Sequence, residues 1–157
     1  MYTLKRSLVA AALLGVCGVS GAVSCTLSTN DVTLPPYYWT APQPLIYSPT
    51  VATLACSSPT PDDIGLSLSL GDFTGDGLRS LSSGPDRLSY RISLPGPLGL
   101  QPWGDGEGGS VQFERTLVNF TSSNFDIAPT LELPPGQRVR GGNYGASLTL
   151  TLNILAP

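Results

Sequence analysis

The sequence contains no histidine, and charged residues make up only 12% of its 157 residues. Lysine occurs once, at Lys5. Histidine is the side chain most often used as a general base, and lysine is the usual amine nucleophile. Catalysis would therefore depend on carboxylates, and none of the eleven lies in a recognisable site pattern. We expect a protein that is not an enzyme; a carbohydrate-active enzyme with a carboxylate pair is the weakest alternative.

Long apolar runs are also missing, apart from one at the N-terminus. The run SLVAAALLGVCGV of about 13 residues follows Lys5 and Arg6, which is typical of a secretory signal. A membrane-spanning helix needs about 20 apolar residues, so this run is short for one. We predict a signal peptide over 1–22, cleaved after Ala22, and one domain over 23–157. The domain would be secreted through the periplasm to the cell surface and would not be membrane-embedded.

Basic residues are scarce in the predicted mature chain. Six arginines remain there against eleven acidic residues, a formal charge of −5. So few arginines cannot form a basic stripe, which argues against nucleic acid and anionic lipid as partners.

Three cysteines are present, and Cys17 leaves with the signal. In an oxidising compartment Cys25 and Cys56 most simply form a disulfide with each other. The disulfide would close a loop of about 32 residues, and in the chain-entropy model this contributes roughly 3–4 kcal/mol to the stability of the folded state. The alternative is two separately buried thiols.

Apolar residues alternate with polar ones in several segments, which predicts β-strands with one buried face. No stretch has a helical period, and glycine and proline punctuate the chain at short intervals. About seven strands are expected, so the fold class is all-β, an immunoglobulin-like β-sandwich. The predicted inward residues of the three clearest strands are Ile64, Leu66, Leu68 and Leu70; Leu88, Tyr90, Ile92 and Leu94; and Tyr144, Ala146, Leu148, Leu150, Leu152 and Ile154.

The segment LPPYYWTAPQPLIYSP is too apolar for a solvated linker and is interpreted as a long loop or edge segment. It contains three consecutive aromatic residues, Tyr37, Tyr38 and Trp39. At least one of these rings is expected to face outward as a surface contact. The alternative places two rings in the core and the third flat on the surface.

Two glycine-rich segments match parts of known ligand-binding motifs in sequence. WGDGEGG matches G-x-G-x-x-G, but a strand-like SVQF follows it where a dinucleotide site needs a helix. DFTGDG carries Asp72 and Asp76, yet the twelfth position of an EF-hand loop would be Ser83. We predict neither a cofactor nor a metal.

Five segments follow one another along the chain and carry a resemblance to a known family: CTLS, TVATLAC, RSLSSGPDRLSYRIS, WGDGEGG and GGNYGASLTLTLNI. In these segments the chain resembles the spore coat protein U domain, which is shared with subunits of archaic chaperone–usher pili. The resemblance covers Cys25 to Leu155. It departs from the family at LPPYYW, where a phenylalanine- and glycine-rich segment is usual.

The resemblance implies a pilin-like sandwich that lacks one strand and leaves an apolar groove open. A periplasmic pilus chaperone would fill the groove first, and at the usher a neighbouring pilus subunit would replace it with a donor strand. The last strand would line the groove, and the chain would be a structural or adhesive pilus subunit. The expected groove residues are Tyr144, Leu148, Leu150, Leu152 and Ile154.

A polymerising subunit needs a donor strand of its own, roughly ten residues ahead of its first cysteine. After cleavage at Ala22 only Val23 and Ser24 precede Cys25. The expectation is a subunit that accepts a strand without donating one, and so is terminal. The alternative is a self-complete, spore-coat-like secreted protein in which LPPYYWTAPQPL closes the groove.

Overall fold

The computed structural model describes residues 22–71 and 75–155, so most of the predicted signal peptide and Asp72 lie outside the described residues. The described residues form nine strands and no helix, which confirms the all-β fold class. Nothing in 22–71 or 75–155 is a helix long and apolar enough to cross a membrane. The strands are β1 Ser24–Thr29, β2 Leu45–Tyr47, β3 Ala52–Leu70, β4 Arg79–Ser83, β5 Asp86–Gly96, β6 Gly99–Pro102, β7 Phe113–Ile127, β8 Thr130–Leu133 and β9 Leu150–Leu155.

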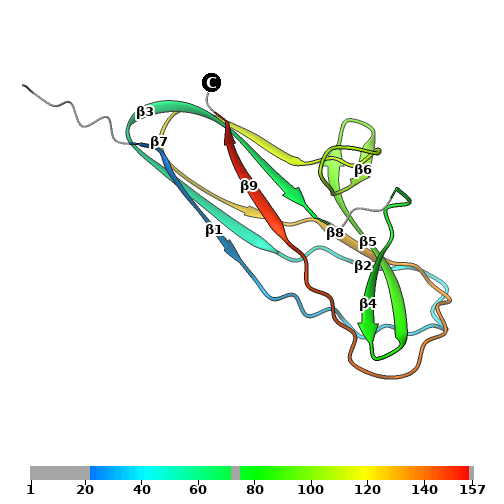
Figure 1. The fold of residues 1–157 in the computed structure, drawn as a ribbon. Helices are drawn as coiled ribbons and strands as arrows, with labels where there is room; N and C mark the ends of the chain where they lie inside the picture. Colours follow the sequence, from blue (N-terminus) through cyan, green and yellow to red (C-terminus); the bar gives the residue numbers. More distant parts are fainter. Residues whose placement is uncertain (1–21, 72–74, 156–157) are drawn as a thin grey trace, which may run out of the picture.

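Strand β3 organises the first sheet. Its first part pairs with β1, its last part pairs with β9, and β7 follows it along both parts. The register between β3 and β7 shifts between Ser57 and Ile64, where the sequence contains Pro59 and Pro61. Proline has no amide hydrogen to donate to a ladder, and register shifts of this kind bend a strand. Figure 1 shows β3 turning back at this point, so its two parts lie in opposite layers.

The second sheet has the order β2-β8-β5-β4, and β6 pairs with the end of β5. Two-residue turns and glycines with positive φ, such as Gly84 between β4 and β5, allow these tight antiparallel connections. The outer edge of β4 meets the chain once more, through a bridge between Ser82 and Gly145. The two sheets together form the predicted β-sandwich.

The core confirms two of the three predicted alternations. In β3 the inward residues from Ile64 to Leu70 are buried, and so are those of β5 from Leu88 to Leu94. Trp103 is fully buried, and its Nε1 donates a hydrogen bond to the Leu68 carbonyl at 3.0 Å. The glycine-rich loop that begins at Trp103 is therefore part of the core scaffold.

The third alternation is only partly realised. A strand was expected from Tyr144 onward, but β9 begins at Leu150. Between them the chain makes the single bridge at Gly145 and is mostly exposed. The segment meets the outer edge of β4 at Gly145 alone, so no ladder of paired residues forms beside it and the strand does not extend.

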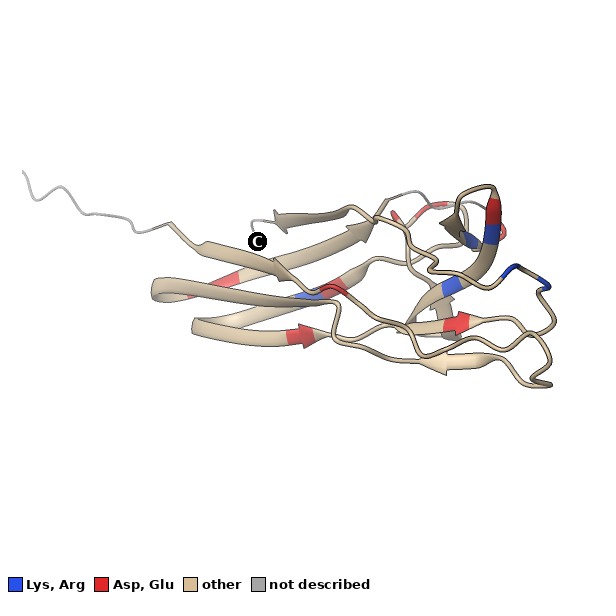
Figure 2. Ribbon diagram, turned by 90° about the horizontal axis from the view of Figure 1, so that it is seen from below, with Lys and Arg blue, Asp and Glu red and all other residues tan. Residues whose placement is uncertain are grey.

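The charged residues are unevenly distributed. Figure 2 shows most of the Lys and Arg segments at the end of the molecule away from the C-terminus. That end contains the hairpin of β4 and β5 and the long connection from β8 to β9 (Figure 1).

Candidate functional site

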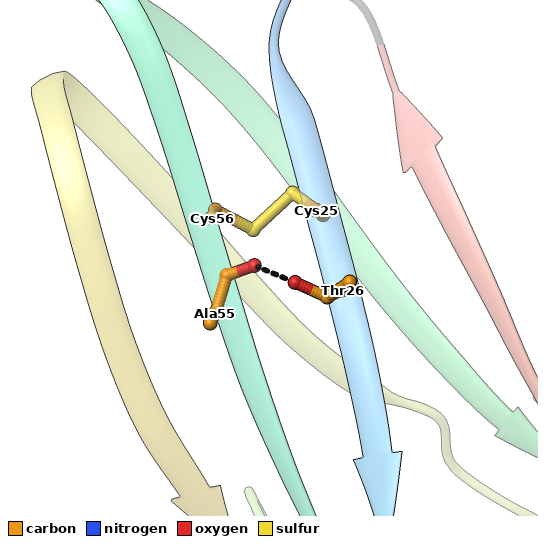
Figure 3. The surroundings of a disulfide bond; sticks show 4 residues. All are labelled: Cys25, Thr26, Ala55 and Cys56. Carbon is orange, nitrogen blue, oxygen red and sulfur yellow. Dashed lines mark hydrogen bonds between the residues drawn. A yellow bond between two sulfur atoms is a disulfide. The ribbon is translucent and has the colours of Figure 1, made fainter.

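Strand β1 is fixed to β3 by the disulfide expected from the sequence. Cys25 and Cys56 are directly paired in the antiparallel register and are joined by a disulfide bond, as Figure 3 shows. One residue further on, the Thr26 hydroxyl donates to the Ala55 carbonyl at 3.3 Å. The bridge confirms the predicted pairing and holds β1 at the edge of the sheet.

Strand β9 points its apolar residues inward but does not bury them. Leu152 pairs with Leu68, and Ile154 pairs with Leu66. The two β3 residues are buried, whereas Leu152 is half-buried and Ile154 remains 45% exposed. Among the described strands β9 pairs with β3 alone, so no described strand pairs with its far edge.

Strands β1 and β9 lie along the same edge of β3, because β7 occupies the other edge throughout. Since β3 turns back on itself, β1 lies in one layer and β9 in the other, on one side of the sandwich (Figure 1). In the described part of the chain neither strand pairs with anything beyond β3. We call their inward residues, together with Val23 just before β1, the open seam: Val23, Cys25, Leu27, Leu150, Leu152 and Ile154.

The open seam is continuous with the core and contains no charged residue. Leu27 and Leu152 each pack against both groups of buried side chains, so they lie at the centre of the seam. Beneath them are the fully buried Leu54 and Leu68. Two unpaired strand edges with half-buried apolar side chains between two layers can accept an additional strand.

The opposite side of the sandwich carries larger side chains, although β7 also pairs with β3 alone in the described part of the chain. There the β7 ribbon brings Phe113 and Phe125 together, with ring centroids 5.9 Å apart. The guanidinium of Arg115 lies over the Phe125 ring at 5.6 Å. We call these three residues the closed seam. Phe113 packs against one group of buried side chains and Phe125 against the other, both rings are half-buried, and an open pocket lies beside Phe113.

The predicted groove residues separate into two groups. Leu150, Leu152 and Ile154 belong to β9 and the open seam, whereas Tyr144 and Leu148 precede the strand. The Tyr144 hydroxyl donates to the Arg140 carbonyl at 2.8 Å. Desolvation and then the Asp86 carboxylate raise the pKa of Tyr144, with Arg140 opposing them.

Leu148 lies beside a different opening. It lines an open pocket with Leu78 and Tyr90, between β4 and the chain leading to β9. The structure therefore brings Leu148 close to the second sheet rather than to β1. Desolvation raises the pKa of the buried Tyr90 phenol, which the charge of Arg79 partly offsets.

The aromatic loop is only partly a surface feature. The Tyr37 hydroxyl donates to the Pro134 carbonyl at 2.8 Å and accepts from the Gln137 amide at 2.9 Å. Tyr38 and Trp39 are exposed, as expected for at least one ring. The loop lies against the segment after β8 and leads into β2, so in this structure it does not close the open seam.

The glycine-rich loop after Trp103 holds its own polar groups. The Asp105 carboxylate accepts hydrogen bonds from the Glu107 amide and the Ser110 hydroxyl, and these bonds lower its pKa. In the other acidic loop, Asp76 accepts from the Leu78 amide at 3.1 Å. Within 22–71 and 75–155, no cluster of three or more metal-ligating side chains occurs.

Sequence reasoning missed β1 as the second wall of the open seam. The alternation of Val23, Cys25 and Leu27 carried that signal, because these residues share one face of a strand. It also missed the closed seam, since Phe113 and Phe125 are separated by the bend in β7 and only the fold shows that they meet.

A scan of family models finds none that matches this chain, and a search of curated proteins likewise finds no match. Among solved structures the chain is similar to the Escherichia coli Hda pilus minor tip subunit, HdaB, with 17% sequence identity and a TM-score of 0.39. That alignment covers 87% of this chain and 85% of the other. The likeness is remote, so any functional conclusion rests on the chain's own residues.

Proposed function

We propose that this chain is a secreted, non-enzymatic subunit of a chaperone–usher type surface pilus. In this proposal the domain of residues 23–157 accepts a donor strand in the open seam. The main observation in support is that β1 and β9 each have an edge with no partner strand among the described residues. Their inward apolar side chains stay half-exposed above a buried core. The resemblance to the spore coat protein U domain supports the same conclusion from the sequence.

Burial of apolar surface drives the capture. Each Å² of apolar surface removed from water contributes roughly 25 cal/mol, so covering Leu152 and Ile154 together stabilises the complex measurably. The main-chain groups on the free edge of β9 add hydrogen bonds to the incoming strand. Without a donor these edges remain open to unwanted pairing, which is why a periplasmic chaperone would be needed first.

The seam also defines its donor. Its residues are uncharged and alternate along each strand, so a complementary segment presents apolar side chains at every second position. Strand β9 has six residues, and a donor of about that length, roughly 20 Å, would cover it. A chaperone strand and then the extension of a neighbouring subunit fit this description.

The proposal is tested by native mass spectrometry of the protein recovered, without reductant, from the periplasm of cells that produce it. We expect a chain beginning at Val23 in a one-to-one complex with a chaperone. Ile154→Asp places a charge in the open seam and should abolish this complex, because a buried unpaired carboxylate is costly. Val118→Asp, at an exposed valine of β7, is the matched control and should leave the complex intact.

A folded, protease-resistant monomer without any partner would contradict the proposal. The chain would then be the self-complete, coat-like secreted protein, and another of its own segments would have to cover the seam. Equal loss of the complex in both variants would show general destabilisation instead of a specific seam. The melting temperature of each variant separates these two results.

A further inference from the structure

The exposed aromatic residues occupy a rigid turn at the end of the molecule that carries β2 and the β4–β5 hairpin. The Ala41 amide donates to the Tyr38 carbonyl at 3.0 Å, which closes a tight turn with Trp39 at its second position. Prolines flank this turn on both sides and restrict its backbone. Tyr38 is 68% exposed and Trp39 is 46% exposed, so both rings face solvent from a fixed backbone.

A second set of contacts clamps this turn to the sandwich. Gln137, which donates its amide to the Tyr37 hydroxyl, also bonds through its side chain to β5. Its Oε1 accepts from the Ser89 amide at 2.7 Å, and its Nε2 donates to the Ser89 carbonyl at 2.8 Å. Anchored aromatic side chains lose little entropy when they bind, which favours their use as contacts.

An arginine completes the surface. The Arg138 guanidinium lies over the Trp39 ring, 4.8 Å from its centroid. A guanidinium above a ring face keeps its in-plane N–H donors available for a carboxylate. In the described part of the chain Arg138 forms no ion pair, whereas the nearby Arg140 is 4.0 Å from Asp86.

Arginines and acidic residues lie together at this end of the molecule. Figure 2 shows basic and acidic segments there, and Arg140 faces Asp86, whereas Arg138 lies over Trp39. Flat aromatic rings fit the apolar face of a sugar ring, and the two N–H donors of a guanidinium fit a carboxylate. Together these groups favour a sugar that has a carboxylate group.

We propose that Tyr38, Trp39 and Arg138 form a binding site for acidic polysaccharides built from uronic acid units. A sugar ring stacks on the aromatic surface that Arg138 leaves exposed, and its carboxylate accepts two hydrogen bonds from Arg138. Tyr37 is a positioning residue for the turn and does not contact the ligand. The site goes beyond the proposed function, because it lies away from the open seam (Figure 1) and needs no donor strand.

Binding of polygalacturonate oligosaccharides to the purified protein, with any partner it retains, tests the site. The fully methyl-esterified oligosaccharide has the same rings without the charge and serves as the matched ligand. We expect the ester to bind about tenfold more weakly, the effect of losing one charge-assisted bidentate contact. Trp39→Ala and Arg138→Gln should each weaken binding of the acid by a similar factor.

Two control variants keep the result specific. Arg91→Gln removes an exposed arginine that faces Glu132, and Leu98→Ala removes a large apolar side chain that is 88% exposed. Neither should change the affinity by more than about twofold. Arg138→Lys keeps the positive charge but loses the paired guanidinium N–H donors. Its affinity for the acidic oligosaccharide should therefore lie between those of wild type and Arg138→Gln.

Tryptophan fluorescence gives a readout that does not depend on the variants. The chain has two tryptophans, and Trp103 is buried while Trp39 is exposed. The acid should protect Trp39 from iodide quenching and leave Trp103 unaffected. Three outcomes would each overturn the proposal: equal binding of the acid and the ester, no protection of Trp39, or equally tight binding of DNA or anionic vesicles. None of these outcomes depends on whether the open seam accepts a strand.

Discussion

The two sides of the sandwich present different residues at the same positions of β3. Leu68 is flanked by Phe113 on the closed seam and by Leu152 on the open seam. Leu54 is likewise flanked by Phe125 and by Leu27. The central strand is the same, so the difference comes from the side chains at its two edges.

The two sides differ in side-chain size. Two phenylalanine rings stack on one side, and the Arg115 guanidinium lies over the Phe125 ring. The matching positions of β1 and β9 hold the smaller leucines Leu27 and Leu152, which are half-buried like the two phenylalanines. The two sides therefore differ in the size of their side chains and in the stacking of the rings.

The largest difference in the free energy of unfolding is expected between the variants Leu68→Ala and Leu152→Ala. Leu68 and Leu152 are directly paired between β3 and β9. Leu68 is fully buried, and its truncation should lower the free energy of unfolding by about 4 kcal/mol. Leu152 is half-buried, so the same change there should cost only about 1 kcal/mol. Urea unfolding of both variants measures the difference.

A bound donor strand should reduce that contrast. Once a strand covers Leu152, its truncation should cost about 2–3 kcal/mol in the complex, while the effect of Leu68→Ala should change little. An equal loss for both variants in the free protein would mean that the seam is already filled, and the comparison of the two sides would fail.

The disulfide protects the open side and should have the next largest effect. Changing Cys25 and Cys56 together to serine should lower the free energy of unfolding by about 3 kcal/mol, since the bridge restricts a loop of 31 residues in the unfolded chain. The amides of β1 should also exchange faster with solvent than those of β7, because β1 has six residues on one part of β3, whereas β7 pairs along both parts. Hydrogen exchange with and without reductant measures this, and equal acceleration in β7 would contradict the expectation.

Local alternation predicted the parts of the fold that depend on nearby residues. The inward faces of β3 and β5 and the partner of Cys25 were all predicted from the sequence, because period and cysteine number determine them. The extent of β9 was not, because the residues from Tyr144 to Thr149 alternate as well as those that follow. What separates them is the neighbouring edge, and only the folded chain provides that.

The candidate site shows the same limit. The apolar face of β9 could be predicted, yet its pairing with β1 across the open side depends on the bend in β3. In the aromatic loop the sequence placed three rings together but could not distinguish them. Two hydrogen bonds to distant backbone groups make Tyr37 an anchor, and they leave Tyr38 and Trp39 as surface residues.

The smallest expected effect comes from opening the closed seam. Phe125→Ala removes the ring that stacks on Phe113 and supports Arg115, and it should cost about 2 kcal/mol because Phe125 is only partly buried. Phe125→Leu gives this side a residue like those of the open seam and should cost about 1 kcal/mol. If aromatic side chains keep this side closed, Phe125→Leu should also bind the hydrophobic dye ANS more strongly than wild type. Unchanged dye binding in a folded variant would show that the backbone of β7, and not its phenylalanines, closes this side.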